Sequence, residues 1–175
     1  MGLTRRNRDM KLKQLVGLGL LTLALSVSAQ VLTESDWQES EAPAPPAFSS
    51  KQLIPIEMPK YVAMRLGVDP ATLSITPDGL VRYVVLAINA NGSVSAMYEG
   101  IRCASAEVKT YARSSGSGPW SPVPDPQWRK LNDNLPSRHA LALARQGLCD
   151  GRSPSSNSVA ALVMTLRNAK ADQYR

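Results

Sequence analysis

His139 is the only histidine in the 175-residue chain, so any histidine-based acid–base chemistry must use this side chain. It directly follows Arg138, early in a helix-forming run. A nucleophile activated by His139 would have to be a serine or a free cysteine within hydrogen-bond reach, and no serine occupies a recognisable nucleophile elbow. We therefore favour a structural or helix-capping histidine, because a general base is established by geometry before pKa.

Glu99 is the second residue suited to acid–base chemistry. It lies in a largely apolar β-forming run, and Arg102 follows three residues later. Alternation along a strand places Glu99 and Arg102 on opposite faces unless a bulge at Gly100 changes the register. Since a buried carboxylate needs a cationic partner, we expect an arginine from a neighbouring element to pair with Glu99. The alternative is a small envelope hydrolase that uses Glu99, His139 and Arg138, which requires these side chains to converge in one cleft.

Three tryptophans are candidates for contact with a partner. Trp37 is isolated in a polar segment, and Trp120 and Trp128 lie in a loop rich in proline, serine and glycine. Such side chains either pack back on their own domain or meet another protein, and packing back is favoured for all three. The candidate binding residues are these three tryptophans together with Glu99, Arg102, Arg138 and His139.

The basic side chains do not form a polyanion site in the sequence. They are scattered over several predicted elements, which is typical of a solvated surface; the positions are Arg82, Arg102, Lys109, Arg113, Arg138 and Arg145. We expect no nucleic-acid partner and no cofactor. Two cysteines and one histidine without finger-type spacing also argue against a metal site.

The N-terminus has the pattern of a cleavable signal peptide. Five basic residues and one acidic residue precede an apolar stretch over residues 15–27. The sequence Val27-Ser28-Ala29 at its end fits a signal-peptidase cleavage site. Thirteen apolar positions are too few for a membrane span. We predict a signal peptide over residues 1–29, no membrane span after its removal, and a periplasmic or secreted protein. Removal lowers the net charge from +6 to +2, because the segment carries five basic and one acidic side chains.

Export makes a disulfide the preferred interpretation of the only two cysteines, Cys103 and Cys149. Closing a loop of this length contributes about 4 kcal/mol to stability in the chain-entropy model. Residues 30–50 are acidic and rich in proline, which predicts a disordered tether. A single globular domain is expected over residues 51–169, followed by a tail over 170–175.

The elements that must position these residues are predicted to form an α+β domain. Three β-rich runs, residues 80–88, 93–104 and 107–113, are separated by turns and indicate an antiparallel meander with a hairpin at Asn91-Gly92. A short run at 73–75 adds a fourth strand. Both faces of residues 80–88 are mostly apolar, so we expect this strand to be covered on both sides. Two C-terminal helices, over residues 137–146 and from about residue 158, complete a sheet of about four strands packed against helices.

Several phrases carry a resemblance to a known family. They are Leu53-Ile54-Pro55-Ile56, the run Val68 to Ile75, Met97-Tyr98-Glu99-Gly100-Ile101-Arg102-Cys103, the run Val108 to Arg113, Asp125-Pro126-Gln127-Trp128 and Ser137-Arg138-His139-Ala140. Over roughly Trp37 to Arg167 the chain resembles the bacterial family named after the cryptic neisserial protein, which consists of small exported proteins. The resemblance implies an envelope or secreted location and a single domain, and no catalytic residue follows from it.

The favoured hypothesis is a non-enzymatic binding or interaction module of the cell envelope. Its partner would be another envelope protein, reached through the segment that bears Trp37 or the loop that bears Trp120 and Trp128. The sequence does not define the oligomeric state.

Overall fold

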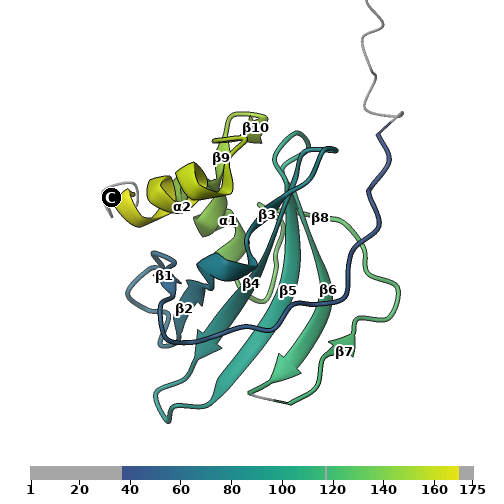
Figure 1. Ribbon diagram of the computed structural model, residues 1–175. Helices are drawn as coiled ribbons and strands as arrows, with labels where there is room; N and C mark the ends of the chain where they lie inside the picture. The colour runs from purple at the N-terminus through teal and green to yellow at the C-terminus, as the bar shows by residue number, and fades with distance from the viewer. Residues whose placement is uncertain (1–36, 117, 170–175) are drawn as a thin grey trace, which may run out of the picture. The chain divides into compact units, whose positions relative to one another are not determined.

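The computed structural model describes residues 37–116 and 118–169, so the predicted signal peptide and the tail lie outside the described residues. Within them, the chain folds into one antiparallel sheet, two helices and a small hairpin (Figure 1). The predicted α+β class with two C-terminal helices and one disulfide is confirmed. The main sheet has eight strands rather than about four.

The long strands are those that the sequence predicted. β4 (Leu80–Ile88), β5 (Val94–Arg102) and β6 (Glu107–Ser115) form the meander, and Ile88 pairs with Val94 across the expected hairpin. Gly92 adopts φ +83° in the connecting turn, a conformation that glycine adopts without steric cost.

The other strands of the sheet are two to four residues long, and one of them, β3, is the short strand predicted at residues 73–75. They are β1 (Ile54–Pro55), β2 (Arg65–Val68), β3 (Ser74–Ile75), β7 (Ser121–Pro122) and β8 (Arg129–Lys130). The sheet order is β1-β2-β4-β5-β6-β7, with β3 also on β4 and β8 also on β6. Alternation cannot be recognised over two residues, and the prolines in β1 and β7 disfavour strand pairing, so the sequence pattern predicted too few strands.

The bulge lies on β6 and not at Gly100. Tyr98 pairs with Ala112 whereas Glu99 pairs with Thr110, so Tyr111 is the extra residue. A Cβ atom on Gly100 would lie 2.8 Å from the Tyr111 hydroxyl, so glycine is the residue that leaves room for the bulged side chain. Because of the bulge, Thr110 and Arg113 follow β5 partners that share one face, Glu99 and Met97.

The helices cover one face of the sheet. α1 (His139–Leu143) continues into a wide π-type turn (Ala144–Leu148), and α2 (Val159–Asn168) packs beside it (Figure 1). α1 therefore starts two residues later than the helix predicted over residues 137–146. Gly147, at φ +110°, lies in the π-type turn that follows α1. The core on this face contains side chains from β4, β5 and both helices, among them Val81, Tyr83, Val85, Ile101, Leu143, Leu162 and Leu166.

The other face is covered by the N-terminal segment, which corrects the prediction of a disordered tether for residues 37–50. Phe48 and Trp120 pack on Val84 and Leu86 of β4, with the Phe48 and Trp120 rings 5.4 Å apart. We call residues 37–50 the strap; it runs along the sheet in Figure 1. Its few apolar and aromatic side chains have a docking surface on the sheet, which composition alone does not reveal.

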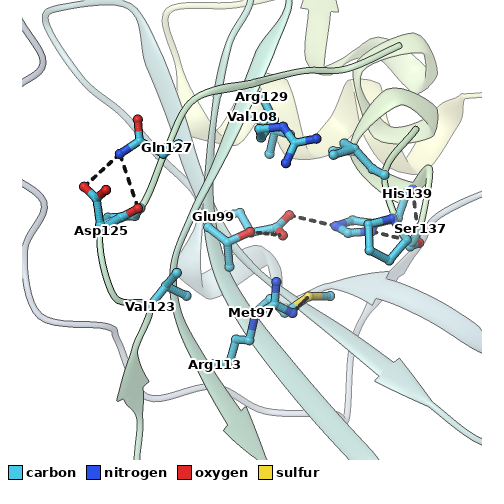
Figure 2. Close-up of a pocket in the computed structure, with 15 residues that line it drawn as sticks. Met97, Glu99, Val108, Arg113, Val123, Asp125, Gln127, Arg129, Ser137 and His139 are labelled. Atoms are coloured by element: carbon cyan, nitrogen blue, oxygen red, sulfur yellow. Dashed lines mark hydrogen bonds and ion pairs between the residues drawn. The ribbon is translucent and has the colours of Figure 1, made fainter. Parts of the chain in front are cut away.

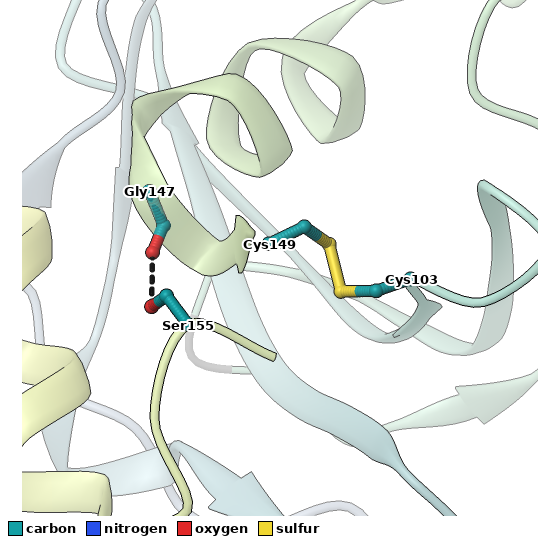
Figure 3. Close-up of a disulfide and its surroundings, with 4 residues drawn as sticks. All are labelled: Cys103, Gly147, Cys149 and Ser155. Atoms are coloured by element: carbon teal, nitrogen blue, oxygen red, sulfur yellow. Dashed lines mark hydrogen bonds between the residues drawn. A yellow bond between two sulfur atoms is a disulfide. The ribbon is translucent and has the colours of Figure 1, made fainter. Parts of the chain in front are cut away.

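Cys103 and Cys149 form the predicted disulfide, with their Cα atoms 5.7 Å apart (Figure 3). It joins the end of β5 to β9 (Cys149–Asp150), which pairs with β10 (Ser153–Pro154). Close to it, the Ser155 hydroxyl donates a hydrogen bond to the Gly147 carbonyl. The bond thus fixes the turn after α1 against the sheet.

Candidate functional site

Glu99 lies on the helix-covered face of β5 and is 2% exposed. Its carboxylate accepts hydrogen bonds from the Tyr83 hydroxyl at 3.1 Å and from the Thr110 hydroxyl at 3.0 Å. His139 Nε2 lies 2.7 Å from Oε2 of the same carboxylate. The cationic partner is therefore His139 and not the arginine that the sequence suggested. Arg102 lies on the opposite face, as alternation predicted, with its guanidinium 3.9 Å from the Trp37 ring centroid.

His139 is the first residue of α1 and is 6% exposed. Its Nδ1 lies 3.0 Å from the Ser137 hydroxyl, and its backbone N–H donates to the same oxygen at 3.4 Å. Glu99, His139 and Ser137 consequently form a continuous hydrogen-bonded chain (Figure 2). Ser137 was not singled out in the sequence, because a serine two residues before a histidine matches no nucleophile motif.

The pKa shifts of the pair favour the ionised forms of both partners. Burial raises the pKa of Glu99, but the charge and the hydrogen bond of His139, with the bonds from Thr110 and Tyr83, lower it below its ordinary value. Burial and the nearby Arg113 lower the pKa of His139, yet the Glu99 carboxylate raises it above its ordinary value. In this ionised form, the imidazolium donates from Nε2 to Glu99 and from Nδ1 to Ser137.

A pocket of about 410 Å³ opens beside this chain, between the sheet and residues 123–137 (Figure 2). Glu99, His139 and Ser137 line one part of it. Its apolar wall consists of Met97, Val108, Val123, Leu135, Pro136 and Ala140. The exposed side chains at its edge are Arg113, Asp125, Gln127 and Arg129. The bulge at Tyr111 is what gives this face both Thr110 and Arg113, since regular alternation would place them on opposite faces.

Arg113 stands out among the charged groups that line the pocket. Arg129 pairs with Asp133 at 2.9 Å, and His139 pairs with Glu99. Arg113 makes a contact with the Met97 sulfur at 3.3 Å, and no ion pair links it to a carboxylate of the described residues. A guanidinium without a carboxylate partner, beside an imidazolium, is suited to bind an anionic group.

The three tryptophans all contact the protein's own strap or sheet. The Trp37 indole N–H donates to the Asp78 carbonyl at 2.9 Å, and its ring meets Trp128 edge-on at 5.8 Å. The Trp120 indole N–H donates to the Pro46 carbonyl at 3.3 Å. None of the three lines the pocket. Trp37 packs back on the domain, as the favoured interpretation had it.

Glu39 is a further residue that the sequence did not single out. Its carboxylate accepts from Lys109 at 2.7 Å, from the Tyr111 hydroxyl at 2.7 Å and from the Trp128 indole at 3.1 Å. Arg82 adds hydrogen bonds to the backbone carbonyls of Ser40 and Glu41. These bonds hold the strap on the sheet face opposite the helices. The sequence does not indicate them, because the bonded residues are far apart in the chain.

Arg138 does not join Glu99 and His139 in the pocket. It lines a separate groove between residues 58–64 and α1. No group of three metal-ligating side chains occurs within residues 37–116 and 118–169. In that same part of the chain, no helix combines the length and apolar character that a bilayer crossing requires.

Comparison with known proteins identifies the family of the chain. The model of the CNP1-like family matches residues 32–167, which is most of the sequence, and the chain therefore belongs to this family. The predicted resemblance is thereby confirmed. Neither the curated proteins nor the solved structures gave a significant match.

Proposed function

We propose that this member of the CNP1-like family is an exported binding module of the cell envelope, whose pocket takes a small molecule with an apolar body and an anionic group. The observation that carries the proposal is Arg113, which lies at the pocket without a carboxylate partner and near the His139 imidazolium. The apolar wall formed by residues such as Val108 and Leu135 suits the body of the ligand.

The binding test uses a matched pair of probes, benzoate and benzamide, which differ in charge and share the ring. Titration is followed by ¹H–¹⁵N NMR of the mature chain from Gln30. We expect benzoate to shift the pocket resonances and Arg113→Gln to weaken its binding about ten-fold or more, because a hydrogen bond to a charged group contributes roughly 1.5–3 kcal/mol. Arg167→Gln, an exposed arginine outside the pocket, serves as the control.

Equal shifts with benzamide and benzoate would refute recognition of the anionic group. An unchanged benzoate affinity in Arg113→Gln would remove Arg113 from the site.

Export is supported by the basic residues, the apolar stretch and the Val27-Ser28-Ala29 sequence at the N-terminus. The disulfide agrees with an oxidising compartment. Expression in a Gram-negative host followed by osmotic shock is expected to release a chain that begins at Gln30 in N-terminal sequencing. An uncleaved chain that stays in the cytoplasm would contradict this part of the proposal.

A second candidate function is ester or amide hydrolysis by Ser137, since its hydroxyl lies 3.0 Å from His139 Nδ1 and His139 is oriented by Glu99. The raised pKa of His139 argues against it, because it favours the imidazolium, which cannot accept the serine proton. We expect a fluorophosphonate probe to leave Ser137 unlabelled at about pH 6, where the imidazolium predominates. Labelling that is lost in Ser137→Ala would establish the hydrolase instead.

A further inference from the structure

A second concave surface lies next to α1. It is a groove of about 410 Å³ between residues 58–64 and the helix, and we call it the α1 groove. Large apolar side chains are exposed here, with Tyr61 84% and Met64 40% exposed. Its remaining apolar lining is Met58, Pro59, Val62, Pro136, Leu141 and Ala142. Exposed aromatic and methionine side chains around a groove are typical of protein–protein interfaces.

The charged side chains of the α1 groove are all basic. Arg138 and Arg145 line it, no acidic residue does, and both are exposed. No ion pair links either arginine to a carboxylate of the described residues. Leu141 also lines the groove and lies between the two arginines in sequence, whose backbone positions are about 10 Å apart at the rise of an α-helix.

We propose that the α1 groove docks a peptide segment of another protein that carries two carboxylates on either side of an apolar side chain. In an extended peptide, side chains four residues apart point to the same side about 13 Å apart, and the side chain midway between them is on that side too. The flexible arginine side chains can reach two carboxylates at this spacing. Each carboxylate pairs with one guanidinium, and the apolar side chain enters the groove beside Leu141 and Val62.

The composition favours a peptide over a lipid surface as the occupant. A membrane-binding face is a broad convex patch rich in lysine and arginine, whereas here two arginines border a groove with methionine and tyrosine along it. Arginine, tyrosine and methionine are enriched at protein interfaces, and methionine adapts its shape to the partner. The tryptophans expected to reach a partner are engaged with the strap, which leaves the α1 groove as the interaction surface.

The test is a selection of phage-displayed twelve-residue peptides on the mature, disulfide-bonded chain. Arg138→Gln/Arg145→Gln is used for counter-selection. We expect the enriched peptides to share two acidic residues four positions apart, with an apolar residue midway between them. The synthetic consensus peptide is then measured by fluorescence anisotropy, together with its Glu→Gln analogue. The double arginine variant should weaken binding about 100-fold and Tyr61→Ala about ten-fold.

Matched controls separate the groove from the rest of the surface. Met164→Ala removes another exposed methionine, 63% exposed, and Arg167→Gln removes another exposed arginine; neither residue lines the α1 groove, so both should leave the affinity unchanged. Tyr61→Ala changes an exposed side chain and is expected to fold normally.

The proposal is overturned if no acidic consensus is enriched, or if the selected peptides bind the double arginine variant with equal affinity. Binding of the chain to phosphatidylglycerol vesicles that depends on Arg138 and Arg145, without any peptide consensus, would assign the surface to a membrane instead. Neither result bears on the pocket of Arg113, because the benzoate titration reads that site separately.

Discussion

Replacing Glu99 by glutamine is expected to change the pH dependence of stability on both sides of pH 6.5. The folded-state pKa of His139 is raised, so its contribution to stability is complete below the unfolded value of 6.5 and is lost as the pH rises through the folded pKa. The folded-state pKa of Glu99 is lowered, so its contribution is present above the unfolded value of 4.5 and is lost as the pH falls through the folded pKa. The pair therefore stabilises the fold most between these two values.

The variant removes the group that raises the pKa of His139. Burial and Arg113 remain, and both lower it, so His139 becomes neutral in the folded state while the unfolded chain still takes up a proton below pH 6.5. The free energy of unfolding of Glu99→Gln then rises with pH up to about 6.5 and is level above it, whereas the His139 contribution of the unmodified protein is level below pH 6.5 and falls above it. Each unit of pKa difference changes the free energy by 1.36 kcal/mol, with opposite signs in the two proteins.

His139→Ala and Glu99→Gln are expected to lower the free energy of unfolding by different amounts. His139→Ala leaves the Glu99 carboxylate buried with only the Tyr83 and Thr110 hydroxyls as partners, which is expected to cost about 3–5 kcal/mol at neutral pH. Glu99→Gln costs less, because His139 can release its proton and still donate from Nε2 to the amide oxygen.

The assay is urea denaturation followed by tryptophan fluorescence, with the disulfide intact, at about pH 5.5, 7 and 8.5. Subtracting the free energy of unfolding of the variant from that of the unmodified protein at each pH removes the contributions of the other titrating groups. Glu41→Gln is the control, since it makes the same charge change at an exposed position and should leave the slope unchanged. Parallel curves for the unmodified protein and Glu99→Gln would refute the ionised pair.

Three further variants test the contacts that hold the sheet, the helices and the strap together around the candidate site. Cys103→Ser/Cys149→Ser opens a loop closed over 46 residues and should lower the free energy of unfolding by about 4 kcal/mol in urea denaturation; a loss below about 1 kcal/mol would contradict the loop-closure estimate. Gly100→Ala places a Cβ 2.8 Å from the Tyr111 hydroxyl and should cost about 1–3 kcal/mol, an effect that Tyr111→Ala should largely remove in a double-mutant cycle. Glu39→Ala should cost about 1–2 kcal/mol and accelerate hydrogen exchange in residues 37–50, with β4 unchanged; uniform exchange would show that Glu39 does not anchor the strap.

The parts of the fold that the sequence predicted are those with local signals. The apolar run of nine residues indicated β4, the Asn91-Gly92 turn indicated the first hairpin, and two cysteines in a chain predicted to be exported left one pairing. The short edge strands carry no such period, because their pairing depends on partners distant in sequence. The strap was mistaken for disorder for the same reason: its stability comes from Glu39 and Phe48 reaching side chains far along the chain.

The site was predicted in part. Glu99 and His139 were both singled out, but the contact between them spans 40 residues and depends on the packing of α1 on the sheet. Arg113 enters the pocket only through the bulge at Tyr111, and alternation in β6 would have placed it on the face opposite Thr110. A single inserted residue in a strand is not visible in composition or periodicity, and this is why the pocket escaped prediction.

Pro136 and Ser137 line both the pocket and the α1 groove, so one short piece of backbone is a common wall of two compartments. Ser137 is also held by His139, which connects this wall to the protonation of the buried pair. If binding in the pocket changed the affinity of the groove for a peptide, thermodynamic reciprocity would require the peptide to change the affinity of the pocket by the same factor.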